Sequence, residues 1–159
     1  MTTVREPGAV LADWYTGELG GEALFWQLAS GAEPTAARKW LALAEVEARV
    51  ATRLVPALLE LGLEIPDGAS SVVSARARSG AMAVTPWLGQ MQWLEDIAQE
   101  ALDAMALEAR TLPAALAAIG CLVVAHEQAL VDFARLERAG DGTHSLRPIH
   151  AFLAATATA

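Results

Sequence analysis

The sequence predicts an all-α fold, a four-helix bundle made of two antiparallel hairpins joined by a long crossover. Alanine, the strongest helix former, accounts for 35 of the 159 residues, and runs of β-branched residues are scarce. Apolar residues recur at alternating spacings of three and four along four segments, as expected for helices with one buried face. The two outer connections are short and the central one is long, whereas a simple up-and-down bundle would need no long connection.

The four helices are expected at about 8–30, 34–61, 85–110 and 111–140. Thr85 and Thr111 are each followed within two residues by a proline, which favours a capped helix start at both places. A short last helix is expected at 145–155, followed by a frayed tail. The chain is therefore interpreted as one domain over 1–159, with the bundle at about 8–140 and a short helix and tail at 141–159.

The crossover, residues 63–84, determines the topology. The second helix is roughly 42 Å long at 1.5 Å per residue, and the crossover is long enough to return along it. A short helix at 70–77 is expected inside this segment. In the first helix, Gly17, Gly20 and Gly21 either allow close helix approach or mark a break, and the sequence leaves both possibilities open.

Composition restricts the partners and the compartment. The net charge of −8 argues against nucleic acid or an anionic membrane as the main partner. Cys121 is the only cysteine, so we expect no internal disulfide and a cytoplasmic location, with Cys121 as a small core residue. The chain opens without the pattern of a signal peptide. The longest apolar stretch, 114–125, is shorter than the ~20 residues that span a bilayer and is expected to be a buried helix.

Four polar residues fall on otherwise apolar helical faces: Glu18, Glu22, Glu47 and His126. Glu18 and Glu47 lie at similar distances along the chain on either side of the first turn, so they should face each other. His126 lies about 21 Å from the second turn at 1.5 Å per residue, which also places it near mid-height. Glu127 flanks it, and Asp96 and Glu100 bracket the same level on the third helix. Carboxylates and imidazole that converge inside a bundle are the ingredients of a metal site.

Three stretches carry a family resemblance: 17–25 (GELGGEALF), 43–49 (LAEVEAR) and 126–130 (HEQAL). They resemble the ferritin-like superfamily, in particular small uncharacterised bacterial ferritin-like proteins. The resemblance implies a carboxylate-bridged di-iron centre and an oxidase or ferroxidase activity. The family's Glu-x-x-His signature is incomplete here, because Glu45, Glu47 and Glu127 are followed three residues later by alanine, valine and leucine. A reduced ligand set is therefore expected.

The sequence leaves three interpretations of these residues open. His126 and a glutamate can form a hydrogen-bonded core pair, with Arg49 or Arg53 balancing the charge. Glu22, Glu47 and His126, assisted by Glu18 or Glu127, can bind one Fe, Mn or Zn ion. The same groups can act without metal as an acid–base pair on a small molecule. No catalytic role is assigned to any single residue.

A function of a different class also fits the sequence. The missing second ligand set and an alanine-rich surface that five tryptophans could help to seal favour a non-catalytic scaffold that acts through self-association or a protein partner. A homodimer is the expected assembly, because two-fold dimers are the commonest closed arrangement.

Overall fold

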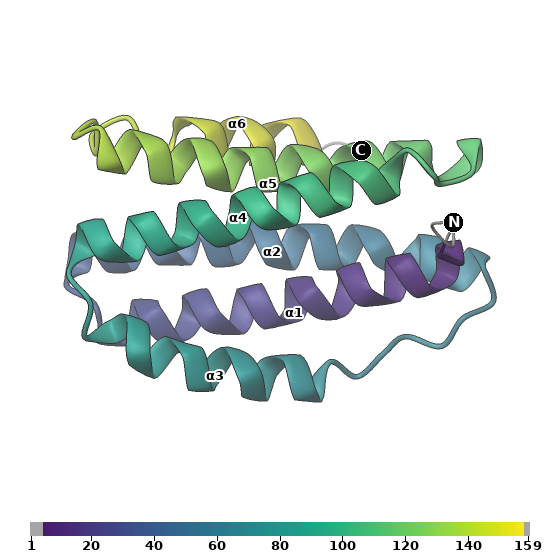
Figure 1. Ribbon diagram of the computed structural model, residues 1–159, viewed down its shortest axis with the longest axis horizontal. Helices are drawn as coiled ribbons and strands as arrows, with labels where there is room; N and C mark the ends of the chain where they lie inside the picture. Colours follow the sequence, from purple (N-terminus) through teal and green to yellow (C-terminus); the bar gives the residue numbers. More distant parts are fainter. Residues whose placement is uncertain (1–4, 158–159) are drawn as a thin grey trace.

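The structure is a computed structural model that describes residues 5–157, and within this range it is all-helical, without a β-strand (Figure 1). The predicted all-α class is confirmed. The described residues form six α-helices and one 3₁₀ turn: α1 (Pro7–Gly31), α2 (Pro34–Glu60), α3 (Ala69–Ala83), α4 (Trp87–Ala109), η1 (Ala114–Leu116), α5 (Ala117–Arg138) and α6 (Arg147–Thr156).

The long helices pack in two pairs. α1 lies against α2 and α4 lies against α5, and each pair runs antiparallel around a short connection (Figure 1). Contacts between α2 and α5 join the pairs, while α6 packs on both α5 and α2. α3 lies along the outer side of α1 and returns the chain to the end where α4 begins (Figure 1).

The crossover contains more helix than the sequence predicted. Instead of a short helix at 70–77, α3 runs for 15 residues from Ala69 to Ala83. It starts after Gly68, whose φ of +64° suits glycine. It packs on α1 at Gly20, where an added Cβ would lie at an ordinary contact distance of 3.4 Å from Ser71. α1 itself is continuous through Gly20 and Gly21, so these glycines do not break the helix, and the missing side chain of Gly21 makes room for Glu47 of α2.

The predicted threonine caps are wrong. α4 begins at Trp87 without a side-chain cap, and the Thr85 hydroxyl bonds to the carbonyl oxygen of Ala81 in the preceding turn. The Thr111 hydroxyl likewise turns back to Glu108, and a 3₁₀ turn delays the start of α5 to Ala117. Both hydroxyls are used by local backbone acceptors, which compete with capping.

The expected tail begins later than predicted. Thr156 is buried at the end of α6, where its hydroxyl donates to the Phe152 carbonyl and its own carbonyl accepts from Arg53. The last two residues of the expected tail, 158–159, lie outside the described residues.

One side of α5 is exposed, which corrects the expectations that Cys121 is a core residue and that 114–125 is a buried helix. Cys121 is an exposed free thiol and does not belong to the core. The segment Ala114–Arg138 is long and apolar enough to cross a membrane by length and composition, but 44% of its most apolar window is buried in the fold. A core helix of a globular protein can be equally long and apolar, so composition alone does not assign a membrane location. The buried side of α5 carries the polar residues described below.

A partly buried ion pair ties α2, α4 and α5 together at one end of the molecule. Lys39 forms a salt bridge with Glu137, which also accepts a hydrogen bond of 2.8 Å from the indole nitrogen of Trp87. The Lys39 ammonium further donates to the Gly142 carbonyl and lies 5.7 Å from the Trp87 ring centroid. Burial raises the pKa of Glu137, but the hydrogen bonds from Lys39, Ser145 and Trp87 and the charge of Lys39 together outweigh it, and the pKa is lowered overall.

The first prediction concerns this ion pair. Glu137→Ala should destabilise the protein by about 3 kcal/mol, because it leaves the largely buried Lys39 ammonium without its carboxylate. Glu45→Ala, which removes an exposed i,i+4 pair with Arg49, should cost at most about 0.5 kcal/mol. Urea unfolding of both variants tests this, and equal losses would contradict it.

Candidate functional site

The site is organised around His126 on α5, whose side chain is fully buried. Its Nδ1 lies 3.1 Å from the carbonyl oxygen of Val123, one turn earlier on the same helix. A carbonyl oxygen only accepts, so Nδ1 carries the hydrogen. This bond fixes the ring orientation and leaves Nε2 directed into the interior as a free acceptor or metal ligand.

Three carboxylates face Nε2 of His126. The distances from Nε2 are 3.2 Å to Glu18 Oε2, 3.4 Å to Glu47 Oε1 and 3.9 Å to Glu127 Oε1. All three glutamates are buried, and they come from α1, α2 and α5. We refer to these four residues as the Glu/His cluster. One ligand atom from each of Glu18, Glu47 and His126 lies within 4.8 Å of the other two, close enough to share one metal ion.

One oxygen of the cluster makes no hydrogen bond. Glu18 is 1% exposed, and its Oε2, although 3.2 Å from Nε2 of His126, is the buried side-chain polar atom in the described residues that accepts no hydrogen bond. A buried acceptor without a donor costs about 1–3 kcal/mol. An atom that faces both Nε2 and a second carboxylate fits a proton or a cation placed between them.

The cluster binds protons tightly when no cation is present. Burial raises the pKa of Glu18 well above its usual range, against the opposing effect of His126. Burial likewise raises the pKa of Glu127 to about 7. For His126, burial lowers the pKa, but the facing Glu18, Glu127 and Glu47 raise it more, and the pKa ends well above its usual value. Glu18, Glu127 and His126 therefore hold protons more tightly than usual, and a bound cation would displace them.

Local sequence makes room for the cluster. Gly21 lies opposite Glu47, where a methyl group would overlap the Glu47 carboxylate. Glycine in mid-helix costs about 1 kcal/mol relative to alanine, and here its missing side chain admits a buried carboxylate. Gly17, one turn earlier, has open space beside it.

The structure brings together four of the five residues predicted for the site. The residues that converge are Glu18, Glu47, His126 and Glu127. Glu22 is half-buried and is not among the residues whose ligand atoms lie close enough together to share one metal ion. Asp96 and Glu100, expected at the same level, are exposed on α4.

The expected charge partners are used elsewhere. Arg49 pairs with Glu45, and Arg53 donates to the Thr156 carbonyl, so neither forms a bond to the cluster. α4 instead faces the cluster with the apolar residues Leu94, Ile97 and Ala98.

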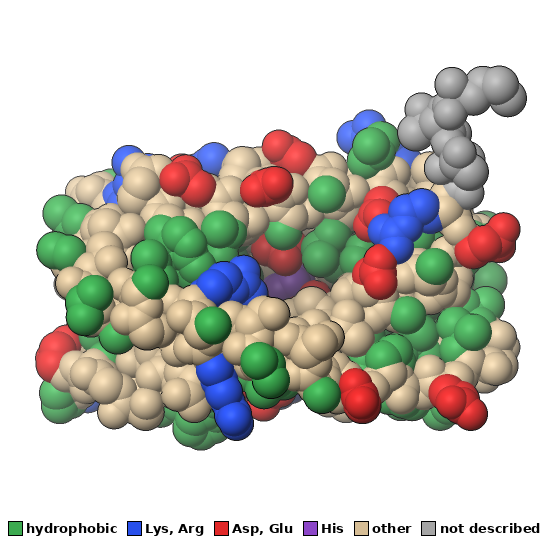
Figure 2. Space-filling model, turned by 60° about the horizontal axis from the view of Figure 1, so that its bottom comes forward, with side chains coloured by type: hydrophobic (Ala, Val, Ile, Leu, Met, Phe, Trp, Pro, Cys, Tyr) green, Lys and Arg blue, Asp and Glu red, His purple; other side chains and the backbone are tan. Residues whose placement is uncertain are grey.

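A cavity of about 220 Å³ adjoins the cluster. Glu18, Glu47 and Glu127 form part of its wall, and Figure 2 shows a hollow with acidic and histidine side chains at its base and basic side chains beside it. The basic residue that lines it is Arg78 of α3, which the sequence did not single out for this site. Arg78 lies in the crossover, where no periodic pattern of apolar residues predicts which side chains approach the site.

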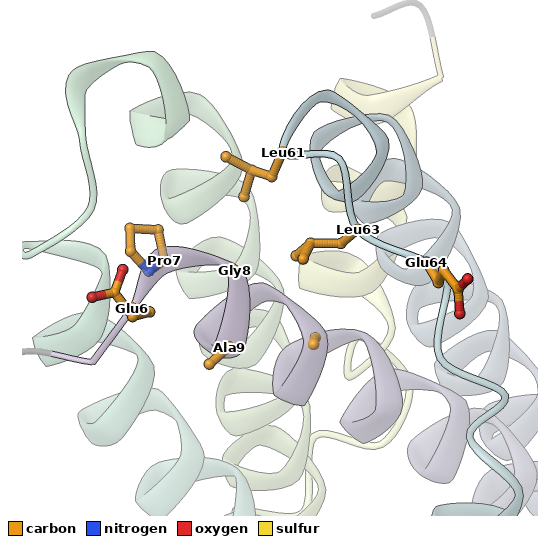
Figure 3. Close-up of a pocket in the computed structure, with 8 residues that line it drawn as sticks. Glu6, Pro7, Gly8, Ala9, Leu61, Leu63 and Glu64 are labelled. Atoms are coloured by element: carbon orange, nitrogen blue, oxygen red, sulfur yellow. The ribbon is translucent and has the colours of Figure 1, made fainter.

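A larger cavity, about 570 Å³, lies between the start of α1 and the segment after α2 (Figure 3). Its polar side chains are those of Glu6 and Glu64, both exposed, and its remaining lining is apolar or glycine. Figure 3 shows these two glutamates at opposite sides of the cavity, without a convergent polar group. The functional site is therefore assigned to the smaller cavity.

The second prediction tests whether Glu47 and His126 interact. In metal-free protein, Glu47→Leu and His126→Leu should each destabilise the fold, because each leaves buried polar groups with fewer partners. The double variant should lose less than the sum of the two, with a coupling of about 1 kcal/mol or more. Thermal melts give the three values, and the exposed Glu60 combined with His126 should show additive effects. Additive effects for Glu47 and His126 would mean that the two side chains do not meet.

Comparison with known proteins gives no further assignment. The chain matches no family model, no curated protein and no solved structure. The function is therefore argued from the geometry of the Glu/His cluster.

Proposed function

We propose that this protein binds one divalent metal ion at the Glu/His cluster inside a ferritin-like four-helix bundle. The observation that carries the proposal is the convergence of Glu18, Glu47 and His126 Nε2, with one buried Glu18 oxygen that makes no hydrogen bond. Glu18, Glu47 and His126 would hold the ion, and Glu127 would assist from α5.

The donor set favours particular ions. Three carboxylates and one imidazole suit Mn, Fe or Zn, since carboxylate is a hard ligand and imidazole binds the later metals. A bound ion would supply Lewis acidity to a molecule in the adjoining cavity. One ion fits better than two, because α4 adds apolar side chains at this level and His126 is the cluster's single imidazole. This supports a reduced site in place of a di-metal oxidase centre.

The ferritin-like arrangement is supported by the connections. The hairpins α1–α2 and α4–α5 are linked by a segment that returns along α1, as a ferritin-like bundle requires. α3 and α6 are then additions to the outside of the bundle. Within this arrangement the cluster lies where ferritin-like proteins place their metals, between facing helices at mid-height.

A scaffold function has separate support from the surface. Several large apolar side chains are at least half exposed, and they occur on α1, α2, α3 and α4 and in the connection before α4: Trp26, Leu59, Val73, Val84, Leu88 and Leu107. Scattered exposed apolar residues are normal, but a homodimer would cover some of them. A scaffold of this kind would need no metal.

The third prediction concerns metal content. Protein purified without chelator should contain close to one Mn, Fe or Zn per chain, and added Mn²⁺ should raise the melting temperature of metal-free protein. Glu18→Gln should abolish this shift, because it removes one charge from the ligand set. His150→Gln, at an exposed histidine outside the cluster, should retain it. Less than about 0.1 metal per chain and no shift with Mn²⁺, Fe²⁺ or Zn²⁺ would exclude the proposal.

The fourth prediction concerns pH. Because the folded-state pKa of Glu127 is raised from 4.5 to about 7, the folded state binds this proton more tightly, and stability falls as pH rises through that window. The raised pKa values of Glu18 and His126 act in the same direction. The stability of metal-free protein should therefore fall by on the order of 3 kcal/mol between pH 5 and 8, and Glu127→Gln should reduce this fall.

Saturating Mn²⁺ should counteract the loss of stability at high pH, because metal affinity rises as the ligands deprotonate. Stability that is flat with pH in urea titrations would contradict the pKa directions.

The fifth prediction separates the two functions. If self-association is the function, light scattering should give a dimer at micromolar concentration in both metal-free and Mn²⁺-loaded protein. A monomer under both conditions would count against the scaffold and leave the metal proposal unaffected.

A further inference from the structure

We propose that the cavity beside the Glu/His cluster binds a small carboxylic acid with an apolar body, and that Arg78 holds its carboxylate. The inference rests on the proposed metal site and names the class of ligand that the site would accept. It is carried by the mixed acidic and apolar lining of the cavity and by a lining arginine that has no partner among the described residues.

The cavity lining combines acidic and apolar side chains. Glu18, Glu47 and Glu127 are its acidic residues. Most of its apolar residues come from α4: Leu94, Ile97, Ala98, Ala101 and Met105. A ligand that fills this space must therefore present an apolar surface to α4, because none of these side chains offers a hydrogen bond.

Arg78 is the basic residue that lines the cavity. Its side chain is exposed on α3, and among the described residues it forms neither a salt bridge nor a hydrogen bond. Basic side chains border the hollow in Figure 2. A guanidinium presents a planar pair of N–H donors that matches a carboxylate, so a free arginine beside an apolar cavity favours an acid over an alcohol or an amine.

Charge explains why the metal would favour this ligand once the carboxylates are ionised. Three carboxylates line the cavity, and in the ionised state they would repel an anion. A divalent ion held by the cluster removes most of that negative charge, and Arg78 offsets the rest. An anionic ligand would then enter a nearly neutral cavity, whereas metal-free protein would disfavour it at a pH that ionises Glu18 and Glu127.

The size of the cavity limits the ligand. A volume of about 220 Å³ corresponds to roughly seven water molecules at about 30 Å³ each. Gly17 lines the cavity, and a Cβ at that position would have no neighbour within 4 Å. The open space beside Gly17 is therefore part of the ligand volume, and an acid of about six carbons is a suitable probe.

The test compares three probes of equal chain length: hexanoate, hexan-1-ol and hexylamine. Isothermal titration of Mn²⁺-loaded protein should show hexanoate binding more tightly than either of the others. Arg78→Gln should weaken hexanoate by about tenfold, because one charge-assisted interaction is lost. Arg76→Gln, at an exposed arginine that does not line the cavity, should leave the affinity within about twofold.

A second pair of variants tests the location. Gly17→Leu would place a side chain in the cavity and should abolish hexanoate binding while Mn²⁺ still binds. Gly80→Leu, at an exposed α3 glycine with open space, should leave both unchanged. Equal binding of hexylamine, or hexanoate binding that is insensitive to Arg78→Gln and Gly17→Leu, would overturn the inference.

Metal binding is measured separately by titration with Mn²⁺ alone. If Mn²⁺ binds and hexanoate does not, the ligand inference fails and the proposed metal function stands. If Mn²⁺ does not bind, both fail.

Discussion

The architecture depends on neutralising a buried concentration of negative charge. Glu18, Glu47 and Glu127 surround one imidazole in an interior where each uncompensated ion would cost several kcal/mol. In the metal-free protein the pKa values of Glu18 and Glu127 are raised, because protonation removes the charge that burial disfavours. A divalent cation would relieve the same constraint without protons. Proton binding and metal binding are thus competing solutions to one electrostatic problem.

The surrounding structure serves this constraint at several levels. The Val123 carbonyl fixes the ring of His126, so that Nε2 faces the carboxylates. Gly21 gives Glu47 the space to enter from α2. α4 contributes an apolar wall, which limits the number of ligands and leaves a cavity next to them. α3 covers the outer side of α1 and contributes Arg78 to the lining of that cavity.

Much of the site could be predicted from the sequence, because the fixed rise of a helix sets the depth of a residue once the turns are known. Turn counting predicted that Glu18, Glu47 and His126 meet, and the structure confirms it. The side of a helix on which a residue lies was harder to predict than its depth along the helix. Glu22 lies about 40° around α1 from Glu18, outside the buried face that includes Trp14 and Glu18. Cys121 was misplaced for the same reason, since the buried face of α5 runs through Gly120, Val123 and Glu127. The length of α3 and the role of Arg78 depend on tertiary contacts with α1, which no local pattern encodes.

The most direct test of the central claim is the position of a metal in the interior. We would measure anomalous X-ray scattering at the manganese edge from crystals grown with Mn²⁺ above pH 7.5. The account predicts one peak per chain, about 2.0–2.3 Å from carboxylate oxygens of Glu18 and Glu47 and from Nε2 of His126. The contradicting result is the absence of a peak there, with Nε2 of His126 in a direct hydrogen bond of about 2.8 Å to one carboxylate. That outcome would make the cluster a proton-sharing core pair.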